Sequence, residues 1–180
     1  DVTINKYYPF SSNYNGNSIE TSKGLNKIGN KNLIRSLIKF KLWIDPNILL
    51  NKADLELKGF SHVYSPTTNE SVFQLLNSSW TNNNTSWYNQ LNCQLNQTVS
   101  PINNVNTTSL NENRIINMLT FFNYWKNNNQ QNNGFLFNLN NENFLTEIQN
   151  YMRFYSSNHT DQNLIPKVNF NITVVSNCSI

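Results

Sequence analysis

The sequence predicts an all-β protein, an antiparallel two-sheet β-sandwich of jelly-roll type, and three observations lead to that fold class. Short segments of alternating apolar and polar residues recur along the chain, as in strands that bury one face. Long polar segments rich in Asn, Ser and Gly separate them. Helical patterns are few. With 180 residues and neither an internal repeat nor a linker, the chain is expected to be one domain, residues 1–180.

The clearest strand signals flank a proline turn at Asp45-Pro46. Residues 33–43 alternate before the turn, where Phe40 lies between two lysines, and residues 53–58 alternate after it. Two such runs joined by a short connection are typical of neighbouring strands in one antiparallel sheet. We therefore expect these two strands to pair with each other.

The remaining elements follow from the same pattern. The sequence predicts an N-terminal strand within residues 2–8, a short one at 18–21, and two strong ones at 71–76 and 168–175. The aromatic run 115–125 is expected to turn from a strand into a short helix. The side chains expected between the sheets are Phe40, Leu55, Leu57, Phe73, Phe170 and Ile172.

Composition excludes several classes of protein. Hydrophobic residues make up 38% of the chain, which is enough for a core, but charged residues make up only 13%. Asparagine takes their place, at roughly one position in five. The net charge of +3 comes without a Lys/Arg cluster, so no nucleic-acid partner is expected. No apolar run approaches the ~20 residues that span a bilayer. The chain starts directly with a strand pattern, as a mature product does after signal cleavage.

Nine Asn-X-Ser/Thr sequons favour an extracellular or cell-surface protein that carries N-linked glycans. An Asn-rich chain also forms sequons by chance, and Asn-rich bacterial proteins are not modified in this way. Several sequons nevertheless fall in predicted loops, where an acceptor is exposed. A further sequon begins at Asn83, but it and the adjacent Asn84 are not both expected to be modified. The acceptors we expect are Asn69, Asn77, Asn84, Asn96, Asn106, Asn158 and Asn171.

The chain has two cysteines, Cys93 and Cys178. In a secreted protein an even count suggests a disulfide, which here would tie the C-terminal tail to the middle of the domain. The alternative is two unpaired buried thiols. No Cys/His spacing fits a zinc site, so neither a metal nor a cofactor is expected.

No catalytic constellation is found in the sequence. The two histidines, His62 and His159, lie in Ser/Asn surroundings, and base catalysis needs an oriented partner. Asp54 and Glu56 share one strand face, but alternating charges on a solvent face explain them better than a glycosidase pair does. The five glycines form no phosphate loop. We therefore expect a protein that is not an enzyme.

Seven short blocks follow one another along nearly the whole chain: Arg35–Phe40, Ala53–Leu57, Trp80 with Thr85–Trp87, Asn117–Trp125, Gly134–Phe137, Phe154–Ser156 and Pro166–Val168. In this order they resemble the motifs of the DNRLRE-domain family, extracellular β-sandwich modules also classed among carbohydrate-binding modules. The resemblance implies a jelly-roll-like sandwich without catalytic machinery, found beside polysaccharide-degrading enzymes and in surface and appendage proteins.

Two non-catalytic functions stay open. The first is a structural subunit of a surface or filamentous assembly of copies of this chain. Residues 1–10 (DVTINKYYPF) would serve as an exchangeable strand, because they alternate, lie at a terminus and precede a Ser/Asn/Gly segment. The simpler alternative is that this strand pairs inside its own domain.

The second function is recognition of an extracellular polysaccharide through exposed aromatic faces. Trp43, Trp80 and Trp125 lie in apolar patterns and are expected in the core. The aromatic residues that we expect to be possible sugar platforms are Trp87, Tyr88, Tyr64 and Tyr124.

Overall fold

The alternating segments form mostly strands, and one short helix accompanies them among the residues that the structure describes. The computed structural model describes residues 1–6, 12–13, 18–25, 31–63, 70–81, 85–87, 95–106, 111–128, 132–142 and 150–174. The elements are β1 (Val2–Asn5), β2 (Ser12–Asn13), β3 (Ser18–Leu25), β4 (Lys31–Ile38), β5 (Ile48–Leu57), β6 (Gly59–Val63), β7 (Ser71–Leu75), β8 (Ile102–Val105), β9 (Arg114–Asn117), α1 (Leu119–Asn127), β10 (Phe135–Leu139), β11 (Asn150–Tyr155) and β12 (Lys167–Val174).

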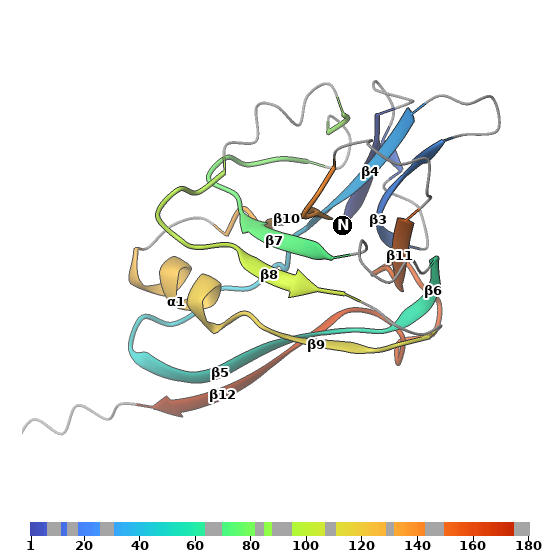
Figure 1. Ribbon diagram of the computed structural model, residues 1–180. Helices are drawn as coiled ribbons and strands as arrows, with labels where there is room; N and C mark the ends of the chain where they lie inside the picture. The colour runs from blue at the N-terminus through green and yellow to red at the C-terminus, as the bar shows by residue number, and fades with distance from the viewer. Residues whose placement is uncertain are drawn as a thin grey trace, which may run out of the picture.

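The strands form two antiparallel sheets, one of them curled into a half-barrel (Figure 1). The larger sheet has the order β6-β11-β3-β4-β10-β7-β8, and β1 pairs with β4 and with β2 off this path. The smaller sheet has the order β12-β5-β9. The predicted all-β class is therefore confirmed.

The core between the sheets is unusually rich in phenylalanine. Phe73 on β7 stacks on Phe137 of β10, with ring centroids 4.4 Å apart, and meets Phe135 edge-on at 5.7 Å. Leu55 and Leu57 of β5 face the same core and are fully buried, as predicted. Helix α1 directly follows β9, as predicted for the aromatic run 115–125, which was expected to turn from a strand into a short helix.

Helix α1 closes one end of this core with aromatic side chains. Phe121, Phe122 and Trp125 point inward and are buried, which accounts for the aromatic run in the sequence. The Met118 N–H at the start of the helix donates to the carbonyl of Ala53 on β5 at 2.7 Å. The helix is thereby fixed to the smaller sheet.

The predicted pairing of the two strands around the proline turn is wrong. β4 belongs to the larger sheet and β5 to the smaller one, so the chain crosses between sheets over residues 39–47. β4 ends at Ile38, whereas the alternation predicts a strand to residue 43. Alternation identifies a segment with one buried face, but it does not identify which strand lies beside it.

The predicted burial is wrong for three of the six side chains. Phe40 is only partly buried against the core. Phe170 and Ile172 on β12 are 39% and 50% exposed. β12 is one of the two edge strands of the smaller sheet, and its apolar side chains reach beyond the core that covers the inner strand β5.

The contrast between two phenylalanines provides a test of this core. Phe73→Ala is expected to lower the free energy of unfolding by about 3–5 kcal/mol, because it removes a fully buried ring. Phe170→Ala is expected to cost about 1–2 kcal/mol, since much of its surface already meets water. Urea unfolding followed by circular dichroism measures both, and equal losses would contradict this account of the core.

Candidate functional site: an apolar groove beside an edge strand

β12 is a long edge strand with an apolar face. Its eight residues pair with β5 alone among the described strands (Figure 1). Phe170 and Ile172 lie on one face of β12, together with Val174, which is 72% exposed. An edge strand of this length presents a row of backbone N–H and C=O groups that can pair with another strand.

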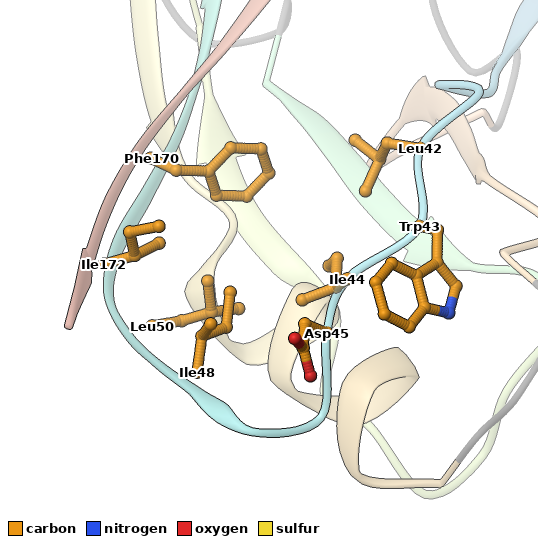
Figure 2. A pocket seen from close by; sticks show the side chains of 8 residues that line it. All are labelled: Leu42, Trp43, Ile44, Asp45, Ile48, Leu50, Phe170 and Ile172. Carbon is orange, nitrogen blue, oxygen red and sulfur yellow. The ribbon is translucent and has the colours of Figure 1, made fainter. Parts of the chain in front are cut away.

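A groove lies beside this face of β12. It has a volume of about 330 Å³ and is lined almost entirely by apolar side chains from three segments (Figure 2). Asp45 is its single charged lining residue. The residues that line the groove are Leu42, Trp43, Ile44, Asp45, Ile48, Leu50, Phe170 and Ile172.

The wall opposite β12 is the segment that joins the two sheets. Residues 39–44 alternate between exposed and partly buried side chains, as a strand does, yet they belong to no described strand. The Phe40 carbonyl accepts bonds from Leu42 N–H at 3.0 Å and from Asn132 Nδ2 at 2.9 Å, which are not ladder bonds. The groove therefore lies over the face of the β12–β5 pair, and an extended segment outside the described strands forms its other wall.

The turn at residues 45–48, between the wall segment and β5, explains the direction in which the wall segment runs. Asp45 Oδ1 accepts hydrogen bonds from the Asn47 N–H and Nδ2, and Ile48 N–H donates to the Asp45 carbonyl at 3.3 Å. The turn reverses the chain into β5, which runs antiparallel to β12. Residues 42–45 and β12 therefore run in the same direction along the two sides of the groove (Figure 2).

The opposite face of the smaller sheet is polar. Asn51 Nδ2 donates to Asn171 Oδ1 at 3.1 Å and to Thr173 Oγ1 at 2.9 Å. Glu56 is paired with Lys58, and the hydrogen bond from Lys58 is the main cause that lowers the pKa of the Glu56 carboxyl, while burial acts against it. The charged side chains of the sheet thus lie on this face, which also exposes two apolar side chains, Leu49 and Ile115.

The groove offers an apolar surface with one carboxylate, Asp45. No three His, Cys, Asp or Glu side chains in the described part of the chain lie close enough to hold a metal ion. His159 Nδ1 accepts a hydrogen bond from the Asp161 N–H at 3.1 Å, and the His159 ring packs on Tyr155. This side chain therefore stabilises a turn. The side chain of His62 lies outside the described residues.

The structure does not gather the predicted sugar-binding residues into one platform. Trp87 is half-buried against a small cluster around Trp80, and the Arg35 guanidinium lies 4.6 Å from the centre of its ring. Tyr124 packs against the main core from α1. Tyr64 and Tyr88 lie outside the described residues.

The aromatic side chain that sequence analysis missed is Trp43, which was expected in the core and is 78% exposed at the groove. The available signal was its position at the end of the alternating segment 33–43. In that alternation Trp43 shares the parity of Lys39 and Lys41, which are both exposed.

The sequons differ in how their side chains are placed. Asn77, Asn158 and Asn171 are exposed, Asn106 is half-buried and accepts a bond from Arg114, and Asn96 is buried. Asn96 Nδ2, the atom to which a glycan would be joined, donates to Asn77 Oδ1 at 2.8 Å. Two further expected acceptors and both cysteines lie outside the described residues; these are Asn69, Asn84, Cys93 and Cys178.

No protein-family model and no curated protein matches the chain. The resemblance to the DNRLRE-domain family stays a prediction. Within the described residues, no helix has the length and apolar character needed to cross a bilayer.

Glycan occupancy is expected to follow side-chain exposure. In material secreted from a eukaryotic host, Asn158 should carry an N-glycan, because it is exposed in the turn after β11. Asn96 should stay unmodified, because its Oδ1 also accepts the Thr98 and Val99 N–H groups and fixes the side chain. Glycopeptide mass spectrometry checks both sites, and a glycan on Asn96 would contradict this packing.

Proposed function

We propose that this chain is a non-catalytic structural module of an extracellular or cell-surface assembly, in which neighbouring copies are joined by β-strand pairing. The observation that carries the proposal is the outer edge of β12, with which no described strand pairs, on a strand whose apolar face borders a groove. The sequons and the low charge support the setting outside the cell.

The composition of β12 supports pairing with another chain. Proteins that stay monomeric protect edge strands with charges, prolines or bulges. β12 has one charged residue, Lys167 at its start, and no proline. Its one irregularity, between Asn171 and Ile172, is in its pairing with β5 and does not protect the outer edge.

The N-terminal residues 1–10 are the strand that we propose joins the copies. β1 pairs with β4 of its own chain over four residues, from Val2 to Asn5. An exchanged terminal strand can form pairing of this kind with a neighbour instead. Because such a contact is head-to-tail, repetition produces a filament when the rotation does not close a ring.

The finer architecture belongs to the same proposal. Two antiparallel sheets that share one core support a β-sandwich, and the resemblance implies its jelly-roll type. In such a fold the outer strands are the natural sites of contact between modules.

A second candidate is a carbohydrate-binding module, favoured by the exposed ring of Trp43 at the groove. Sugar sites combine an aromatic face with several polar groups that fix the hydroxyls. The groove has a single carboxylate, and the turn around Asn47 already uses one of its oxygens. An apolar protein segment therefore suits the groove better than a sugar.

Proline substitution separates the two functions. Thr3→Pro with Asn5→Pro removes two backbone N–H donors and is expected to abolish assembly, seen as monomers in sedimentation velocity and negative-stain images. Polysaccharide binding should be unchanged. The matched control is Thr3→Ala with Asn5→Ala, which keeps the donors and should still assemble.

Wild-type protein that stays monomeric at high concentration would contradict the assembly function. Polysaccharide binding that depends on Trp43 or Trp87 would then support the second candidate. Thermal unfolding of each variant shows whether a lost assembly reflects a lost fold.

A further inference from the structure

The exposed apolar side chains gather at one end of the molecule. Among the described residues six large apolar side chains are exposed, and only Ile115 on β9 lies elsewhere. Figure 1 shows that end, where the start of β5, the end of β12 and helix α1 come together. An exposed apolar cluster of this kind marks a surface that another molecule or a membrane covers. The other five side chains, named the apolar tip here, are Trp43, Leu49, Phe170, Ile172 and Val174.

The apolar tip is continuous and wraps around the end of the smaller sheet. Three of its five side chains line the groove. Val174 pairs with Ile48, which also lines the groove. Leu49 lies between Ile48 and Leu50, which face the groove, so it projects from the opposite face of β5. The tip is therefore a rounded end with apolar side chains on both of its sides.

We infer that the apolar tip docks on the surface of a lipid bilayer, with its side chains among the lipid headgroups. A bilayer is fluid and covers a rounded end from all sides, whereas a folded partner needs a matching hollow. This contact goes beyond the proposed strand pairing and does not depend on it. It gives a surface by which a module attaches to a membrane.

The segment before the turn has the composition of an interfacial anchor. Because residues 39–44 alternate, Lys39, Lys41 and Trp43 project from the same side, and all three are exposed. Indole rings are enriched where a bilayer meets water. Lysine stems lie along apolar surface while their charges reach outward, here to lipid phosphates. This row of side chains therefore suits the boundary between headgroups and acyl chains.

The charges around the tip favour anionic headgroups. Within the described residues, no carboxylate forms an ion pair with Lys39, Lys41 or Lys126. Lys126 lies at the tip, because its Nζ donates to the carbonyl of Ile48 at 3.1 Å. Against these three cations stands the carboxylate of Asp45 in the groove. The excess of positive charge attracts a surface that contains anionic lipids.

The backbone of the turn at the tip already has hydrogen-bond partners, which polar groups need when they leave bulk water. The Asp45 side chain accepts the Asn47 N–H at 2.8 Å, and the Asp45 carbonyl accepts the Ile48 N–H at 3.3 Å. The Ile48 carbonyl is bonded to Lys126. The turn can therefore enter the headgroup region with these groups still paired.

Flotation of the full chain with lipid vesicles tests the surface. The wild-type protein is expected to bind vesicles made of equal parts of phosphatidylcholine and phosphatidylserine. Trp43→Ala should weaken this binding by about tenfold, equivalent to about 1.4 kcal/mol, because it removes the indole from the tip. The matched control is Ile115→Ala on β9, which removes an exposed apolar side chain away from the tip and should bind as the wild type does. Circular dichroism checks the fold of both variants.

Lysine substitutions test how the tip is oriented. Lys39→Gln with Lys41→Gln should weaken binding to the mixed vesicles by about fivefold per lysine and leave the weaker binding to phosphatidylcholine vesicles unchanged. Added salt should weaken binding of the wild type more than that of this variant. The control is Lys167→Gln, which changes an exposed lysine at the opposite end of β12. Equal losses on the two kinds of vesicle would overturn this orientation.

Tryptophan fluorescence locates the tip in the bilayer. Lipids with brominated acyl chains should quench a component of the emission that Trp43→Phe lacks. The inference is overturned if the wild type binds neither kind of vesicle, or if Trp43→Ala and Ile115→Ala lose binding equally. Oligomers that depend on Trp43 in sedimentation velocity, without vesicle binding, would assign the tip to a second copy and overturn it as well. The proline variants test the strand pairing through residues 1–10 separately.

Discussion

The packing of Phe135 against its aromatic neighbours is the interaction on which the rest of the structure depends. Its ring centroid lies 5.7 Å from that of Phe73, 6.0 Å from Phe121 and 5.8 Å from Trp125. These neighbours come from β7 of the larger sheet and from helix α1, which is bonded to the smaller sheet through Ala53. One fully buried ring on β10 therefore connects both sheets and the helix.

The residue before Phe135 makes this position possible. Gly134 has a φ of 78°, and a Cβ on it would lie 2.2 Å from the carbonyl oxygen of Ile38, closer than atoms can approach. β10 thus comes close to the end of β4 because residue 134 has no side chain. At the same point β4 ends and the chain begins its crossing to the smaller sheet, so the close approach and the start of the groove wall are neighbours.

The sequence predicts the fold wherever burial follows from alternation alone. Leu55, Leu57 and Phe73 are buried as expected, because each lies on a strand with neighbours on both sides. The same rule fails for Phe170 and Ile172, whose alternation is as regular but whose strand lies at an edge. Alternation records which side chains share a face; it carries no information about how far the core extends beneath that face.

The candidate site was harder to predict for the same reason. A groove is made by segments that are distant in sequence, here the crossing at 42–45 and the strand at 168–174, and no local pattern relates them. Trp43 is the clearest case. Its apolar neighbours in the sequence suggest a place in the core. In the alternation, however, it lies on the same side of the segment as the two lysines before it, which are exposed. Among residues 39–43, those two lysines were the available indication that the parity of Trp43 faces outward.

The errors of prediction point in one direction. Three residues whose burial was predicted wrongly, Trp43, Phe170 and Ile172, line one groove. The predicted burial of Leu55, Leu57 and Phe73 on inner strands holds. Local sequence and tertiary structure normally agree, and places where they disagree tend to be functional.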